Sequence, residues 1–292
     1  MIDQFLNYLR FERNASPQTV QTYEDALREF ESYILHKESG LSLASVDTDL
    51  IRDWMESLMD KGNTASTINK KLSALRSFYR FSLKRNLVKH DPAHCVTGPK
   101  KSKPLPQFLR ESEMDRLLDD LEWSNIYNNV RARTILLLFY ETGLRRSELV
   151  GLDDKDIDFS ACQLKVTGKR NKQRIIPFGE ELESELKHYM AVRDEEFDGE
   201  HEALFLGNKG QRIKGEQVYQ IVRKYLSAVT SLKKKSPHVL RHTFATAMLN
   251  NGAGLEGIKN LLGHESVSTT EIYTHTTFEQ LKRVYKEAHP RA

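Results

Sequence analysis

Cysteines and long apolar runs are scarce in this sequence. Of its 292 residues only Cys95 and Cys162 are cysteines, and they lie far apart, without the spacing of metal ligands. Isolated thiols favour a reducing compartment, so we expect both to be free and the protein to be cytoplasmic. No apolar run approaches the roughly 18 residues that a membrane-spanning helix needs. Residues 1–13 carry Asp3 and Glu12 and are not typical of a signal peptide.

Motifs for a bound nucleotide or metal ion are also missing. The sequence has no P-loop and no H-E-x-x-H pattern. His238 and His242 have the spacing of two zinc ligands on one helix face, but Arg241 between them would repel a cation and no cysteine lies nearby. We therefore expect no metal site and no cofactor.

Acidic residues are absent from residues 61–89, although the net charge of the whole chain is only +3. The basic residues of this stretch are Lys61, Lys70, Lys71, Arg76, Arg80, Lys84, Arg85 and Lys89. Later basic clusters are Lys100, Lys101 and Lys103, and Lys233, Lys234 and Lys235. A basic surface on a nearly neutral protein indicates a polyanionic partner such as nucleic acid, although a solvated helix face would give the same pattern.

Residues 1–97 are predicted to form only helices. Ser16 and Pro17 are typical of a helix start, and apolar residues then recur at helical spacing to about residue 36. Further helices are predicted over about 47–59 and 64–85. The last of these places one apolar stripe opposite its basic residues, and the stripe is Ile68, Leu72, Leu75, Phe78, Tyr79 and Leu83. Residues 98–107 are rich in lysine and proline, which predicts an extended linker between two domains.

Residues 108–292 are predicted to form a mostly helical second domain with one β-hairpin. An apolar helix over 131–140 ends at Gly143. Alternating residues over 163–167 and 173–178 flank a short turn, which predicts two antiparallel strands. Helices resume near residue 180. The expected fold is therefore mainly α, with an N-terminal helical bundle and a small antiparallel β-sheet in the second domain.

Five segments of the second domain carry chemically suggestive side chains. In chain order they contain Arg145 after Gly143, Lys169 at the hairpin tip, His238 with Arg241 and His242, His264 after Gly263, and Tyr273 after a capping box of Ser268 and Glu271. Taken singly, each has an ordinary explanation: a surface arginine, a solvated turn lysine, a capping histidine or a core tyrosine. Arg145 is also expected to lie beside exposed backbone N–H groups at the start of a short helix, which would form an anion site.

Taken together, these residues suit phosphoryl transfer to a hydroxyl nucleophile. Two guanidinium groups can hold the non-bridging oxygens of a phosphate and neutralise the charge that builds up in the transition state. A tyrosine oxygen can attack to form a covalent phosphodiester, and a lysine can protonate the leaving oxygen. Such a reaction needs neither a metal ion nor ATP.

The segments TGLRRSEL, VTGKRNKQRIIP, HVLRH, LLGH and STTEIYTH, in this order, resemble the tyrosine recombinase (phage integrase) family. The sequence is most similar to Xer-type members, which resolve chromosome dimers. The resemblance covers the whole chain and includes an N-terminal SAM-like helical bundle with the segment SPQTVQTY. It implies a site-specific recombinase that cleaves and rejoins DNA strands.

The resemblance also implies a role for each matching residue. Arg145 and Arg241 would bind the scissile phosphate, His238 and His264 would hydrogen-bond it or assist proton transfer, Lys169 would be the general acid, and Tyr273 the nucleophile that forms a 3′-phosphotyrosine. Glu148 would support the site by orienting a histidine or an arginine, while His242 is expected to be structural. Many relatives have glycine where this chain has Arg170, so the hairpin tip is expected to differ in shape, and Arg170 is a further candidate for phosphate contact.

DNA contacts outside the catalytic residues are expected from the basic helix and the linker. The residues concerned are Lys70, Lys71, Arg76, Arg80, Lys100, Lys101 and Lys103. The two domains are expected to clamp duplex DNA, and the resemblance implies four protomers on two DNA sites, either identical or paired with a related recombinase, with a DNA translocase as a further candidate partner. A last helix over about 278–288, started by a capping box of Thr277 and Gln280, would dock in a neighbouring protomer or fold back on its own domain.

Three other functions remain open from the sequence. A type IB topoisomerase uses similar tyrosine chemistry but relaxes supercoils without a defined site. A DNA-binding protein with an inactive site would lack cleavage altogether, and a metal-dependent nuclease would be sensitive to EDTA. The sequence also leaves open whether the recombinase resolves chromosome dimers or integrates a mobile element.

Overall fold

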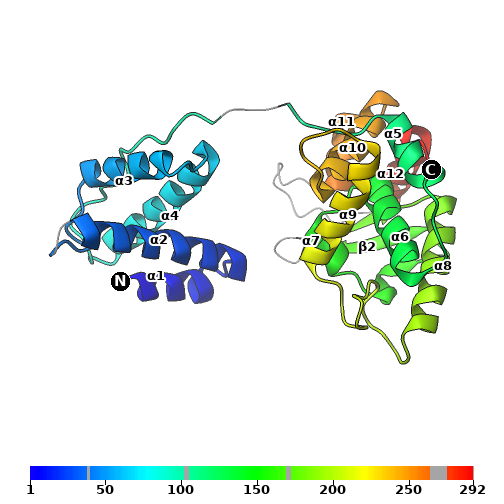
Figure 1. The fold of residues 1–292 in the computed structure, drawn as a ribbon, viewed down its shortest axis with the longest axis horizontal. Helices are drawn as coiled ribbons and strands as arrows, with labels where there is room; N and C mark the ends of the chain where they lie inside the picture. Colours follow the sequence, from blue (N-terminus) through cyan, green and yellow to red (C-terminus); the bar gives the residue numbers. More distant parts are fainter. Residues whose placement is uncertain (38–39, 102–104, 169–171, 264–274, 292) are drawn as a thin grey trace. The chain divides into compact units, whose positions relative to one another are not determined.

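The protein is described by a computed structural model covering residues 1–37, 40–101, 105–168, 172–263 and 275–291. These residues form two compact units, Met1–Pro104 and Leu105–Ala292, each with its own hydrophobic core (Figure 1). Within the described ranges, no helix is both long and apolar enough to cross a membrane.

The first unit is a bundle of helices. Its elements are α1 (Ile2–Asn7), which continues as a π-helical turn over Tyr8–Glu12, α2 (Pro17–Lys37), α3 (Thr48–Asp60) and α4 (Ala65–Lys84). The predicted starts of α3 and α4 are confirmed, because the side chains of Asp47 and Thr64 accept hydrogen bonds from Leu50 N (2.8 Å) and Thr67 N (3.3 Å). Each cap satisfies a backbone N–H that has no partner within the helix.

Aromatic side chains fill the core of the first unit. Phe5 of α1 packs edge-on against Phe78 of α4 with 5.6 Å between ring centroids, and Phe30 of α2 packs against Trp54 of α3 at 4.8 Å. One member of the predicted apolar stripe is wrong, since Leu83 is 41% exposed. The buried stripe of α4 continues through Ser82, and the next residue is turned about 100° away from it.

The second unit is mostly helical with one small sheet. Its elements are α5 (Glu111–Asp115), continued by a π-helical turn over Arg116–Asp120, α6 (Tyr127–Thr142), α7 (Arg146–Val150), a 3-10 turn over Asp154–Asp156, β1 (Ile157–Asp158), β2 (Gln163–Thr167), β3 (Gln173–Pro177), α8 (Glu180–Glu196), α9 (Gly215–Val229), α10 (Pro237–Asn250), α11 (Leu255–Leu262) and α12 (His275–Ala288). The strands form an antiparallel sheet in the order β1-β2-β3. The predicted hairpin is confirmed, whereas the two-residue strand β1 was not predicted.

Helix α6 is the centre of the second unit. It packs against α8, α9 and α10, and its last turns are buried all around (Figure 1). A helix that is surrounded on all sides carries an apolar sequence rather than a single apolar stripe, as residues 135–140 do. The expected fold class, mainly α with a small antiparallel sheet, is confirmed.

Candidate active site

Gly143 turns the chain sharply between α6 and α7. It adopts a left-handed conformation (φ 59°), which costs little only for glycine. A Cβ atom at this position would lie 2.5 Å from Phe244 and 2.7 Å from Leu262, so the close packing also requires glycine. The turn places Arg145 directly before α7.

Arg145 is held by Glu148, one turn further along the chain. Its Nη1 donates to Glu148 Oε1 (2.7 Å), and its backbone N–H donates to Glu148 Oε2 (2.8 Å). The backbone N–H of Arg145 is therefore bonded to this carboxylate and is not one of the exposed N–H groups expected at the anion site. The predicted supporting role of Glu148 agrees with this geometry, since the residue orients an arginine.

Arg241 reaches the same place from α10, which begins after Ser236 with Pro237 in the first turn. It is buried, and it donates from Nη1 to Gly143 O (2.6 Å) and from Nη2 to Leu262 O (2.7 Å). Burial and the positive charge of Arg145 lower the pKa of Arg241 to about 10. The side chain therefore remains charged at neutral pH, and the two predicted phosphate-binding arginines lie close enough to repel each other.

His238 and His242 lie on the exposed side of α10. Desolvation of the ring and the neighbouring charges of His242 and Arg241 lower the pKa of His238, so its neutral form is favoured at physiological pH. The charges of Arg145 and Arg146 lower this pKa further, so His238 lies within electrostatic reach of Arg145 and Arg241, called here the arginine cluster. Among the described residues, no three His, Cys, Asp or Glu side chains are grouped as metal ligands.

Arg174 belongs to the same cluster, although it was not predicted. It is a buried residue of β3, and its Nη1 and Nη2 donate to Glu148 Oε1 and Oε2, each at 2.9 Å. A signal was present in the sequence, since Arg174 shares the inward face of the strand with Ile176, whereas Ile175 points outward.

Three predicted catalytic residues, Lys169, His264 and Tyr273, lie outside the described residues, as do Lys103 and Arg170. The described chain approaches two of these positions at the arginine cluster. Gly168 lies beside Glu148, and Gly263 ends α11 in the predicted left-handed conformation (φ 62°).

The predicted DNA-binding residues of α4 differ in their surroundings. Lys70 and Arg80 are exposed. Lys71 pairs with Glu29 at 2.5 Å, and Arg76 donates to the backbone carbonyls of Ala93 and Val96. Arg76 therefore holds the chain segment that follows α4. Of the linker lysines, Lys100 and Lys101 are exposed.

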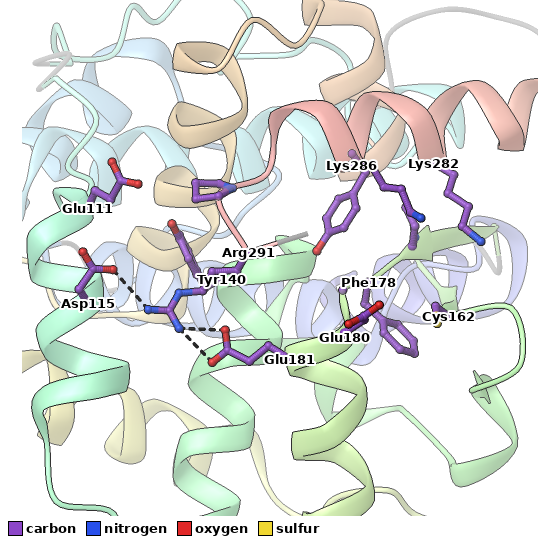
Figure 2. Close-up of a pocket in the computed structure, with 14 residues that line it drawn as sticks. Glu111, Asp115, Tyr140, Cys162, Phe178, Glu180, Glu181, Lys282, Lys286 and Arg291 are labelled. Carbon is purple, nitrogen blue, oxygen red and sulfur yellow. Dashed lines mark hydrogen bonds and ion pairs between the residues drawn. The ribbon is translucent and has the colours of Figure 1, made fainter.

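Helix α12 packs against its own unit. It contacts α10, α11 and β3, with Leu281 and Tyr285 buried. It begins at His275, so the predicted capping box at Thr277 and Gln280 is wrong, because Thr277 already lies inside the helix. Beyond α12, Arg291 pairs with Asp115 and Glu181 (Figure 2). It also pairs with Asp119.

A cleft of about 680 Å³ lies under α12. Lys282 and Lys286 of α12 form one side, and Phe178, Glu180 and Glu181 lie opposite (Figure 2). The cleft contains none of the predicted catalytic residues that the structure describes. The arginine cluster lies elsewhere on the unit, where the Arg145 side chain is 34% exposed.

Comparison with known proteins identifies the family of this chain. The sequence profile of the phage integrase family matches residues 107–280, and that of the phage integrase N-terminal SAM-like domain matches residues 2–86. The chain belongs to the phage integrase family. The SAM-like bundle expected for the first unit is thereby confirmed.

Curated relatives place this phage integrase among the Xer-type tyrosine recombinases. It is 38% identical to tyrosine recombinase XerC of Chlorobaculum tepidum, over 100% of this chain and 94% of that protein. It is 36% identical to XerC of Pelotomaculum thermopropionicum, over 100% of this chain and 98% of that protein. The protein is thus a tyrosine site-specific recombinase, and the topoisomerase and inactive-protein alternatives are not favoured.

A solved structure extends the similarity to three dimensions. The XerH site-specific recombinase bound to a palindromic difH substrate matches with a TM-score of 0.72 and 25% identity, over 97% of this chain and 83% of that one. That structure is a post-cleavage complex.

Proposed function

We propose that this recombinase cleaves one strand of its DNA site with Tyr273 and leaves a 3′-phosphotyrosine. The phenol oxygen attacks phosphorus and passes its proton to a neutral histidine of the site, His238 or His264. The bond from phosphorus to the 5′-oxygen breaks, and Lys169 gives its proton to that oxygen to form a 5′-hydroxyl. Rejoining reverses these steps with the 5′-hydroxyl of the other DNA strand. The phosphodiester is conserved in the covalent intermediate, so the cycle consumes no ATP.

The observation that carries the proposal is the meeting of Arg145 and Arg241 at the end of α11, directly before the segment with His264 and Tyr273. Two fixed guanidiniums stabilise the charge on the non-bridging phosphate oxygens in the transition state. His238, kept neutral by its surroundings, donates a hydrogen bond to phosphate, and His264 has the same role. These groups supply the electrostatics without a metal ion.

The first unit supplies affinity for DNA through its basic helix and the linker at 98–107. The exposed Lys70, Arg80, Lys100 and Lys101 contact phosphates, as does Lys103 of the linker. In the second unit, Arg170 adds a phosphate contact. DNA binding by this chain is supported by its similarity to XerH, which has been solved in complex with a difH substrate. We place the reaction in the cytoplasm, at a specific chromosomal or mobile-element site.

On DNA we expect four protomers on two sites, identical or paired with a related recombinase. Helix α12 would then leave its own unit and pack on α10, α11 and β3 of a neighbouring protomer. Assembly would thereby control the position of the Tyr273 segment. A DNA translocase is a further candidate partner for chromosome dimer resolution.

Replacement of Tyr273 by phenylalanine tests the mechanism. We expect Tyr273→Phe to bind DNA like the wild type and to form no covalent adduct with a nicked suicide substrate on a denaturing gel. The DNA site is found beforehand by sequencing genomic fragments that the wild type captures covalently. The matched control is Tyr225→Phe, which loses only a hydrogen bond to Asn129 and should cleave normally.

Adduct formation by Tyr273→Phe would contradict the assignment of the nucleophile. Wild-type relaxation of a supercoiled plasmid without the captured site would instead indicate a topoisomerase.

A further inference from the structure

The carboxylate of Glu148 is shared by two guanidiniums. Arg174 binds both of its oxygens, and Arg145 binds the same two oxygens through its side chain and its backbone N–H. The Glu148 side chain is 3% exposed and that of Arg174 is 8% exposed. Removing one partner of such a buried ion pair strongly destabilises the folded protein, because the other charge stays buried without compensation.

These two arginines and Arg241 together hold the carboxyl end of α11. Its last carbonyls, which have no partner within the helix, accept one guanidinium each: Leu261 O from Arg174 Nε (2.8 Å), Leu262 O from Arg241 Nη2 (2.7 Å) and Gly263 O from Arg145 Nη2 (2.9 Å). Arg174 is therefore bonded both to the end of α11 and to the carboxylate that orients Arg145.

We propose that Arg174 is a positioning residue of the recombinase, which holds Glu148, and through it Arg145, in fixed register with the end of α11. Arg174 does not touch the phosphate in this proposal. Its planar group makes three hydrogen bonds in fixed directions, two to Glu148 and one to Leu261 O, which lysine cannot reproduce. The inference rests on the proposed role of Arg145 as a phosphate ligand.

The position of Arg174 also relates it to the catalytic segments outside the described residues. A Cβ atom on Gly263 would lie 3.2 Å from Arg174 Cδ, and one on Gly168 would lie 3.4 Å from Glu148 Oε1. Residues 263 and 168 directly precede His264 and Lys169. The Arg174–Glu148 pair thus contacts both Gly168 and Gly263, the last described residues before Lys169 and His264.

Protonation of Glu148 gives the proposal a distinctive readout. Burial alone would raise the pKa of Glu148, but the hydrogen bonds and charge of Arg174, with help from Arg145, lower it to about 2. Arg145 and Arg174 bond to the carboxylate directly, and Arg241 of α10 also faces it through space. Without Arg174 the carboxyl group should bind a proton at a higher pH and release its hold on Arg145.

The test measures the cleavage rate on a suicide substrate and half-site affinity from pH 5.5 to 8.5. For Arg174→Gln we expect about 10- to 100-fold slower cleavage, because small misplacement of a catalytic group has effects of this size. We expect binding to be nearly unchanged and the rate, relative to wild type, to fall further toward acid pH. The acid effect should vanish in the Arg174→Gln/Glu148→Gln double variant, where residue 148 cannot titrate.

Arg174→Lys retains the charge, so we expect a partial recovery of the rate and a ratio to wild type that does not change with pH. The matched control is Arg193→Gln, since Arg193 is also buried and pairs with both oxygens of Asp154 away from the site (2.7 and 2.8 Å). It should lose stability but keep the wild-type pH profile.

A wild-type cleavage rate in folded Arg174→Gln would overturn the proposal, as would a pH-independent loss that matches Arg193→Gln. Should Arg174→Gln fail to fold, Arg174→Lys decides: slower cleavage with normal half-site binding supports positioning, and a wild-type rate contradicts it. Tyr273→Phe is run alongside, so that loss of the proposed nucleophile is distinguished from loss of Arg174.

Discussion

Two buried glutamates near the turn at Gly143 have opposite electrostatic environments. Glu148 lies between two arginines, and its pKa is lowered to about 2 despite burial. Burial raises the pKa of Glu141 to about 7, because hydrogen bonds from Gly179 N–H and the Tyr285 hydroxyl offset only part of the desolvation. One carboxyl group is thus a permanent anion, while the other titrates near neutral pH.

Replacement of Glu141 by glutamine should change how stability depends on pH. The folded pKa of about 7 exceeds the unfolded value of 4.5, so the folded protein binds more protons between these values and loses stability as the pH rises through them. Glutamine cannot ionise, so Glu141→Gln should be more stable than wild type above neutral pH by about 3 kcal/mol. Urea unfolding at pH 5 to 8 measures the difference.

The neighbouring His289, whose pKa burial lowers to about 4, contributes with the opposite sign in both proteins and cancels in the comparison. Stability curves that run parallel for the two proteins would show that Glu141 does not titrate in this range.

At this scale the sequence predicted the residues that belong to motifs and missed those defined by packing. Arg145 and Arg241 stand in recognisable segments. Glu148 was expected to orient a histidine or an arginine, which agrees with its bonds to Arg145. Arg174 was missed because an arginine in a strand is ordinarily expected to be exposed, and its partner Glu148 lies 26 positions away in the sequence. The inward role of Arg76 was hidden for a similar reason, since its carbonyl partners belong to an irregular segment.

At the scale of single elements, the proposed contact of α4 with DNA can be tested through the salt dependence of binding. Its buried stripe packs into the first unit, while Lys70 and Arg80 remain exposed and Arg76 is committed to backbone carbonyls. Capping residues predicted its start because they act locally. The two-residue strand β1 was not predictable in this way, since two residues cannot show an alternating pattern.

Alanine at Lys70 and Arg80 should weaken binding to all DNA sequences. Each phosphate that is no longer neutralised should reduce the slope of log K against log salt by about 0.9, because fewer counterions are released. Gel-shift titrations at several salt concentrations give the slope. Lys187→Ala, which removes a positive charge from an exposed ion pair in the other unit, serves as the control. An unchanged slope in the α4 variant would place the DNA on another surface.

Across the whole molecule, the position of α12 matters most for assembly. In the isolated chain it closes its own unit, with Tyr285 donating to Glu141 Oε2 (2.9 Å) and stacking on His289 at 5.0 Å. The sequence left both this packing and exchange with a neighbour open, because an amphipathic helix shows which face is buried but not in which molecule. Exchange on DNA would reuse the same interactions in a second protomer.

Replacing Tyr285 by alanine should therefore weaken the packing of α12 both within its own chain and in a neighbouring protomer on DNA. Removal of a fully buried aromatic side chain should cost about 3–5 kcal/mol of unfolding free energy. The loss should be independent of protein concentration if the helix packs within one chain. On full DNA sites the variant should also lose cooperative binding of the second protomer. Glu287→Ala, on the exposed side of α12, should change neither property.

A wild-type unfolding midpoint that shifts with protein concentration would instead indicate exchange without DNA.

The interactions of α12 also set the order in which the catalytic unit can be completed during synthesis. The Tyr285 hydroxyl bonds to a residue 144 positions earlier, and His289 Nε2 lies 3.2 Å from Tyr140 O, 149 positions earlier. On the ribosome, α6 emerges long before Tyr285 and His289, which pack on its last turn. Glu141 therefore stays exposed to solvent until these residues have been synthesised. Pairings this distant in sequence also slow folding, because a long loop must close before they form. A nascent chain can therefore fold its SAM-like bundle early, while its second unit is completed only after residues 285–291 have left the exit tunnel.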